Sequence, residues 1–178
     1  MTLIKRFFGH LKTVNSHRKE VKKLMYRCGL RKQGRRHDLS KYSFVEFVNG
    51  IRYFTGTTSP HVGERKAKGY SEAWLHHKAR NKHHSEYWVD IVDGRPAPVE
   101  MPLQYIIEMF CDRIAASKTY LKEKYSDKSP LQYYETHRDE SPLHPKTREK
   151  LEFYLKHLAE KGEDCTFEVI KAQRRNSK

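Results

Sequence analysis

The chain has 178 residues, a formal net charge of +14, 37% hydrophobic residues and 33% charged residues. This length suits one domain, residues 1–178, and is enough to bury a core without disulfides or a structural metal. The 12% aromatic content argues against disorder, and no run approaches the roughly 18 apolar residues of a membrane span. Its three cysteines never form a C-x-x-C pair. We therefore expect a soluble, cytoplasmic protein with reduced thiols and no membrane partner.

Apolar residues at helical spacing, bounded by glycine, proline and capping residues, predict an all-α protein. The predicted helices span residues 4–28, 43–54, 71–88, 102–121 and 145–161. Ser43 and Glu46 form the S-x-x-E pattern of a capping box, and Pro102 suits a first helical position. Gly29 and Gly162 are natural stops for the first and the last helix.

The segments between the predicted helices are of several kinds. Residues 31–36 form a basic connector, and residues 55–70 indicate a loop by their Gly, Pro, Thr and Lys content. Residues 89–100 hold an Asp-Gly turn between short, partly β-branched runs, which predicts either a small β-hairpin or a proline-pinned loop. The final residues, about 171–178, form a basic tail.

Positive charge is concentrated near the amino terminus. Residues 1–41 hold 13 Lys and Arg against two acids, a net charge of +11. A field of this sign attracts polyanions such as nucleic acid, nucleotides or phosphorylated metabolites. A solvated basic face that only keeps the protein dissolved explains the same pattern. The charge therefore indicates a class of partner and nothing finer.

The stretch HHKARNKHH holds four of the 11 histidines. On a continuous helix His77, Asn81 and His84 would share one face, and His76 and His83 would share the neighbouring stripe. Such a helix directs two or three imidazoles into one cavity, as a transition-metal site requires. A solvated, pH-sensitive helix is the alternative. The density of histidines beside two tryptophans favours metal or phosphate binding.

Two other predicted helices carry polar residues on their interior faces. His10 and His17 fall in the sector of the first helix that is otherwise apolar, and for His10 a buried histidine with a backbone partner is the ordinary explanation. Asp112 lies within the most apolar helix, where a carboxylate needs a cationic partner, either Arg or Lys or a metal. Mixed imidazole and carboxylate ligands suit Mn, Fe, Co, Ni or Zn rather than a calcium cage.

The order of these residues resembles a known superfamily. An H…HD…D order, drawn from separate helices of an all-α bundle, is similar to the HD superfamily of metal-dependent phosphohydrolases. HDLSK, residues 37–41, resembles the HD-x-G-K signature of its HD-GYP branch, and the later His pair followed by Glu86 resembles that branch's second-metal histidines. The chain lacks the GYP stretch and has Ser40 where that branch has glycine, which argues against cyclic-di-GMP as the substrate.

Nearly the whole chain also resembles a family of small HD-like proteins without an assigned activity. The motifs of that family are HD-L-S-K, A-W-x-x-H-x-x-x-N-x-H-H-x-E-Y-W and E-M-x-x-D. They appear here as HDLSK, AWLHHKARNKHHSEYW and EMFCDR. The resemblance implies a single HD-like helical bundle but names no substrate.

The superfamily resemblance implies one or two divalent transition metals, drawn from Mn, Fe, Co, Ni and Zn. The residues implied for a first metal are His17, His37, Asp38 and Asp112. A second site would use His77, His83 and His84, with Asp38 as the bridge between the two metals. Whether His10 or His76 also ligates stays open at this point.

The predicted function is that of a metal-dependent phosphohydrolase, either a phosphomonoesterase or a phosphodiesterase. A metal-activated water would attack the phosphorus of a nucleotide or another anionic, phosphorylated small molecule. Asp38 and Lys41 are the catalytic candidates, because Asp38 would bridge the metals and Lys41 would neutralise a phosphate. Arg35, Arg36 and Asn81 are the further substrate-binding candidates.

Two other functions are compatible with the sequence. Some HD-like proteins hold two irons and activate dioxygen, as the inositol oxygenases do. A non-catalytic basic helical module that binds nucleic acid would explain the +11 segment. We rank this module below the hydrolase because nucleic-acid binding does not require Asp112 inside a core helix.

Overall fold

The computed structural model describes residues 1–176, which are mostly helical with one small antiparallel hairpin. The α-helices are α1 (Leu3–Arg27), α2 (Arg31–Arg36), α3 (Phe44–Arg52), α4 (Pro60–Lys68), α5 (Glu72–Lys78), α6 (Leu103–Leu121), α7 (Ser129–Thr136) and α8 (Pro145–Asn176). Short 3-10 turns are η1 (Leu39–Tyr42), η2 (Ser85–Trp88), η3 (Lys122–Lys124) and η4 (Arg138–Glu140). The predicted all-α class is confirmed. Residues 177–178, the end of the predicted basic tail, lie outside the described residues.

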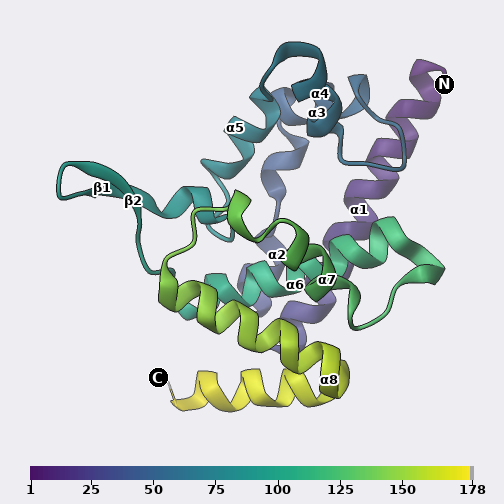
Figure 1. Ribbon diagram of the computed structural model, residues 1–178. Helices are drawn as coiled ribbons and strands as arrows, with labels where there is room; N and C mark the ends of the chain where they lie inside the picture. Colours follow the sequence, from purple (N-terminus) through teal and green to yellow (C-terminus); the bar gives the residue numbers. More distant parts are fainter. Residues whose placement is uncertain (177–178) are drawn as a thin grey trace.

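The core lies where α1, α6 and α8 pack together (Figure 1). Its fully buried side chains include Leu24 of α1, Phe110 of α6 and Tyr154 of α8. Burying one large apolar side chain stabilises a fold by about 1.5–3 kcal/mol. Because α1 and α6 are fixed against each other by this packing, polar residues further along both helices hold defined positions.

The predicted hairpin near residues 89–100 is confirmed. It consists of β1 (Val89–Val92) and β2 (Arg95–Pro98), paired antiparallel with Val89 opposite Pro98. Asp93 and Gly94 both have positive φ, as a two-residue type I′ turn requires. The hairpin projects away from the helices in Figure 1.

Three segments predicted as irregular contain helices instead. The expected loop at 55–70 contains α4, which has Pro60 in its first turn and ends at Gly69 with φ 81°. The segment between the fourth and the fifth predicted helix, to which no helix was assigned, contains α7. The basic connector at 31–36 is α2, which folds back on α1. An added Cβ at Gly34 would lie 2.7 Å from Met25 Cβ, so this close approach depends on glycine.

One predicted helix end is wrong and another is confirmed. The third helix does not reach Trp88, since α5 ends at Lys78 and the histidine-rich segment after it leaves the helix. The last predicted helix does break at Gly162, because this residue has φ 78° and ψ 175°, which are not helical. The label α8 therefore covers two helices, and the described part of the basic tail lies in the second of them (Figure 1).

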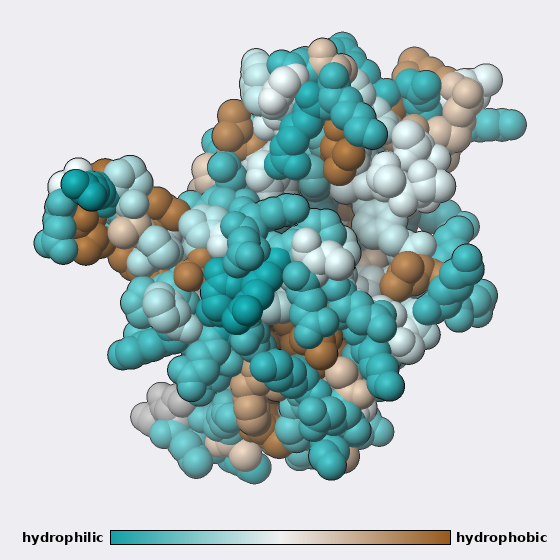
Figure 2. Space-filling view, viewed as in Figure 1, coloured by the Kyte–Doolittle hydropathy of each residue, from teal (hydrophilic) through white to brown (hydrophobic). Residues whose placement is uncertain are grey.

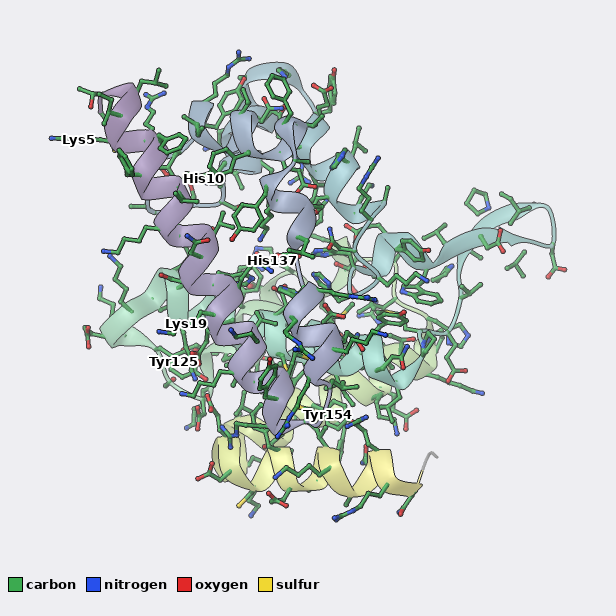
Figure 3. The ribbon with its side chains drawn as sticks, turned by 180° about the vertical axis from the view of Figure 1, so that it is seen from behind. Lys5, His10, Lys19, Tyr125, His137 and Tyr154 are labelled. Atoms are coloured by element: carbon green, nitrogen blue, oxygen red, sulfur yellow. The ribbon has the colours of Figure 1, made fainter. Side chains whose placement is uncertain are left out.

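The amino-terminal half of α1 extends beyond the core. Ile4 in α1 and Phe44 in α3 are apolar, yet they are 69% and 83% exposed. In Figure 3, His10 points toward the interior, whereas Lys5 and Lys19 lie on the outer side of α1. The face shown in Figure 2 is mostly hydrophilic, with scattered apolar residues. None of the helices in the described part of the chain has the length and apolarity that a membrane span requires.

The cysteines are free thiols among the described residues. Cys28 and Cys111 are buried with their Sγ atoms 3.9 Å apart, and Cys165 is exposed. The two buried thiols pack as small core residues between α1 and α6.

Candidate metal centre

The His37-Asp38 pair lies in a turn that directs both side chains inward. α2 ends at His37, and Asp38 has φ 53° and ψ 28°, a left-handed conformation that Asp adopts more readily than most residues. Arg18 Nε donates to the His37 carbonyl at 2.8 Å, which holds this turn against α1. The side chains of His37 and Asp38 are both buried as a result.

A first group of donors forms around Oδ2 of Asp38. It combines His37 with His17 from α1 and Asp112 from α6. The His17 Nε2 atom lies 2.9 Å from Asp112 Oδ1 and 3.7 Å from Asp38 Oδ2. The His37 Nε2 atom lies 3.3 Å from each of these two carboxylate oxygens. The four residues that the resemblance implied for a first metal are thus brought together.

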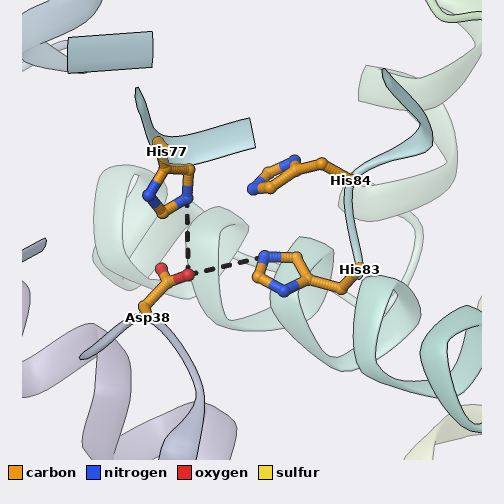
Figure 4. A group of neighbouring side chains, drawn as sticks. All are labelled: Asp38, His77, His83 and His84. Carbon is orange, nitrogen blue, oxygen red and sulfur yellow. Dashed lines mark ion pairs between the residues drawn. The ribbon is translucent and has the colours of Figure 1, made fainter. Parts of the chain in front are cut away.

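A second group forms around the other oxygen of the same carboxylate. His77 Nε2 and His83 Nε2 lie 3.4 and 3.5 Å from Asp38 Oδ1. His84 completes the group, with its ring centroid 4.2 Å from that of His83. Figure 4 shows the three imidazoles and the Asp38 carboxylate pointing toward one another. Asp38 is the only residue common to these two groups.

The second group does not form by the helical spacing expected from the sequence. His77 lies on α5, but His83 and His84 follow the helix in an irregular turn. Because the chain reverses after Lys78, it returns both histidines to the side on which His77 already faces Asp38. The expected pairing of His76 with His83 on one stripe is wrong, since His76 Nδ1 instead lies 2.6 Å from Glu46 Oε1.

The donor separations fit a shared ion. Two donor atoms that each lie about 2.1 Å from one metal stand roughly 3.0–3.4 Å apart. Six imidazole–carboxylate pairs of the two groups are separated by 2.9–3.7 Å, and all donor atoms of each group lie within 4.8 Å of one another. Within residues 1–176, Asp38 Oδ1 and Nε2 of His83 and of His84 are buried without a hydrogen-bond partner, whereas Asp38 Oδ2 pairs with Lys41 Nζ at 2.7 Å. Such a set of nitrogen and oxygen donors suits a borderline transition metal.

A buried glutamate connects the two groups from outside. Glu108 of α6 places Oε1 2.9 Å from His37 Nδ1 and 3.4 Å from His83 Nδ1. Its other oxygen accepts a hydrogen bond from Gln33 Nε2 at 2.5 Å. Because Glu108 accepts hydrogen bonds from the Nδ1–H groups, Nε2 of each ring is left free to face Asp38. One carboxylate therefore orients one histidine of each group.

A second glutamate holds the remaining side of the centre. Glu46 Oε2 lies 2.7 Å from His77 Nδ1, so Nε2 of that ring also faces Asp38. The hydroxyl of Ser40 lies 3.2 Å from the same Nδ1 and accepts from Asn81 Nδ2 at 2.8 Å. Ser43 caps α3 as predicted, but the Glu46 side chain bonds histidines instead of completing the capping box.

The electrostatics of the site favour a charged Asp38 carboxylate and a neutral His84 imidazole. Burial opposes the charge of Asp38, but His37, Lys41 and His77 outweigh it and hold the pKa of its carboxyl well below the usual range. Burial also lowers the pKa of His84 well below its ordinary value, with further effects of His83 and His77. At neutral pH the centre therefore offers Asp38 as an anion and His84 as a free base.

The predicted substrate-binding residues fall in different places. Lys41 Nζ lies 2.7 Å from Asp38 Oδ2, at the edge of the centre. The Asn81 amide is buried and holds Ser40 and the His77 carbonyl. Arg36 lines a hollow on the Glu108 side, whereas Arg35 is exposed. His10 belongs to neither donor group and packs against Phe47.

Glu46 and Glu108 were not among the predicted site residues. For Glu108 a signal existed, since it lies four residues before Asp112 and therefore on the same face of one helix. For Glu46 the capping pattern gave a sufficient local explanation. Its contact with the histidines depends on how α3 and α5 pack, which the spacing of residues does not reveal.

Comparison with known proteins places the chain in a family. Residues 6–157 match the family model described as "Family of unknown function (DUF5662)", so the chain belongs to this family. No curated protein and no solved structure gives a significant match. Both donor groups lie within the matched residues. The resemblance to the HD superfamily stays a prediction.

Metal content tests the two donor groups directly. Protein loaded with Mn, Fe or Zn and then desalted is expected to hold about two ions per chain. The Asp38→Ala variant should lose at least half of this metal, because Asp38 is the ligand that both groups share. His137→Ala, a histidine substitution at the end of α7 and outside both donor groups, should keep the wild-type content. Elemental analysis measures all three, and equal metal in the Asp38 variant would contradict the assignment.

The role of Glu108 has its own test. Glu108→Gln removes an anionic acceptor from His37 and His83, so metal affinity should fall by about 10–100-fold. The matched control is Glu64→Gln, because Glu64 is a buried, hydrogen-bonded carboxylate that contacts Ser71 and Lys68 and no histidine. Competition with a metal-binding dye measures the affinity. An equal loss in both variants would indicate a general effect of the substitution and no specific role for Glu108.

Proposed function

We propose that this protein is a metal-dependent phosphohydrolase that acts on a nucleotide or another phosphorylated small molecule. The observation that carries the proposal is the Asp38 carboxylate, 1% exposed, with each oxygen facing a separate set of histidines. A carboxylate in this position suits the bridging ligand of a two-metal site. Two such ions, when bound, supply a hydroxide nucleophile and stabilise the charge that develops on the phosphoryl oxygens.

The side chains around Asp38 have separate roles in this proposal. Glu46 holds Nδ1 of His77, and Glu108 holds Nδ1 of His37 and of His83, so these three rings present Nε2 inward. Asp112 adds a second anion to the first donor group. Burial opposes the charge of Asp112, but His17 and His37 outweigh it and keep the pKa of this carboxyl well below its usual range. The centre therefore carries negative charge that divalent cations neutralise.

Lys41 is the residue best placed to bind a substrate phosphate. Its side chain is 32% exposed and that of Asp112 is 20% exposed, so solvent reaches the centre on this side. Burial opposes the charge of Lys41, but Asp38 and Asp112 outweigh it and raise the pKa of the ammonium. Lys41 is therefore charged at neutral pH, beside the opening through which an anion would enter.

Hydrolysis of model esters tests the proposal. The metal-loaded protein is expected to hydrolyse p-nitrophenyl phosphate or bis(p-nitrophenyl) phosphate. Asp38→Asn should lower kcat by at least about 100-fold, because the bridging anion stabilises the transition state through the metals. Lys41→Gln should mainly raise KM, because it removes a charge that binds the phosphate. Steady-state kinetics with each ester separate the two effects.

Two controls make the result interpretable. His137→Ala should keep wild-type kcat and KM, because His137 lies outside both donor groups. Activity that Asp38→Asn leaves intact would belong to a contaminating phosphatase and would contradict the proposal. Complete absence of hydrolysis with every metal tested, in protein that binds two ions, would also contradict the proposal.

The alternative functions give different results in the same preparation. A di-iron oxygenase would show activity only with iron and would consume dioxygen. A nucleic-acid module would bind an oligonucleotide whether or not metal had been removed, with a strong dependence on salt concentration. The buried donor groups favour the hydrolase over this module, because binding to nucleic acid does not require a buried bridging carboxylate.

A further inference from the structure

A basic hollow lies beside the metal centre, on the Glu108 side. It has a volume of about 660 Å³, within the range of small-ligand sites. One wall comes from α2 and the other from the segment that follows α5. Five cationic side chains line the two walls: Arg31, Lys32, Arg36, Arg80 and Lys82. We call this cavity the basic hollow.

These five cations are not paired with acids. Within residues 1–176, no carboxylate forms an ion pair with any of them. Arg31 and Lys82 lie only over tyrosine rings, and Arg80 donates to the His76 carbonyl. Like charges that converge on one cavity repel one another, and an anion bound between them relieves the repulsion.

Glu108, the one acid that lines the basic hollow, does not offset this charge. Its oxygens are engaged by His37, His83 and Gln33. Glu108 is 4% exposed, and both of its oxygens are thus occupied inside the protein.

The basic hollow and the proposed catalytic opening lie on different sides of His83. The Nε2 atom of this ring faces Asp38, whereas its Nδ1 atom faces Glu108, which lines the hollow. Neither Asp38 nor Lys41 lines the hollow. A ligand in the hollow would therefore leave the Asp38 and Lys41 side of the centre free.

We propose that the basic hollow is a second anion site, which binds a polyphosphate chain, either free or as the tail of a nucleotide. This inference goes beyond the proposed function and does not depend on it. One orthophosphate carries about two negative charges at neutral pH and would leave most of the five cations uncompensated. Several linked phosphates match the number of cations that line the hollow.

The lining of the basic hollow favours recognition of phosphate over recognition of a base. Tyr105 is its only aromatic residue, and the Lys82 ammonium already lies 5.7 Å from the centroid of that ring. A nucleobase would have to displace this cation to stack on the ring. The site should therefore bind inorganic triphosphate about as tightly as nucleoside triphosphates, whatever their base.

Calorimetric titration of metal-free protein tests the second anion site. Inorganic triphosphate should bind one per chain and at least about tenfold more tightly than orthophosphate. Lys32→Gln/Lys82→Gln should weaken binding by at least about tenfold, because both lysines are exposed and line the hollow. The matched control is Lys150→Gln/Lys161→Gln, which removes the same charge from exposed positions of α8.

Each outcome of this titration either supports or overturns the second anion site. Loss of binding in the Lys32/Lys82 variant alone supports it. An equal loss in the Lys150/Lys161 control would show general attraction by a basic protein and would overturn the proposal.

Loss of binding in Lys41→Gln alone would place the ligand at the metal centre. Tighter binding of a single-stranded oligonucleotide than of triphosphate would assign the hollow to nucleic acid instead. Absence of triphosphate binding would overturn the proposal outright.

Discussion

The burial of Asp38 is the constraint on which the rest of the structure depends. An ionised carboxylate in a protein interior costs several kcal/mol unless cations or hydrogen-bond donors compensate it. Here part of the compensation comes from Lys41, three residues after Asp38. The rest comes from residues distant in sequence: His17 on α1, His77 on α5 and His83 in the turn after it. The packing of α1 against α6 and the reversal of the chain after α5 both serve to bring these groups to one carboxylate.

Two further carboxylates turn this cluster into an ordered centre. Glu46 and Glu108 contact the outer nitrogens of the histidines, so the inner nitrogens have defined directions. Ligands that are oriented before a metal binds lose less entropy on binding it, which raises affinity. The environment of the centre differs between its two sides. Lys41 and Asp112 border its solvent-exposed side, and the basic hollow borders Glu108 on the other.

The sequence predicts the members of this centre better than it predicts their placement. Helix class, the Ser43 cap and the hairpin follow from local patterns, and His17 and Asp112 stand out because they are polar residues on apolar helical faces. The histidine segment was expected to be one helix, yet His83 and His84 reach Asp38 because α5 ends early. Where a helix of mixed polarity ends depends on tertiary packing, which local propensity does not encode. Glu46 was not predicted as a site residue for a related reason, since its place in the capping pattern already accounted for a glutamate at this position.

If Asp38 bridges two metal ions, the positions of those ions in a crystal will reveal it. A crystal of the protein loaded with Mn or Zn would show their places by anomalous scattering. We predict two peaks about 3.5–4 Å apart, one beside Oδ1 with His77, His83 and His84 and one beside Oδ2 with His17, His37 and Asp112. A single peak remote from Asp38, or none in metal-saturated crystals, would contradict it.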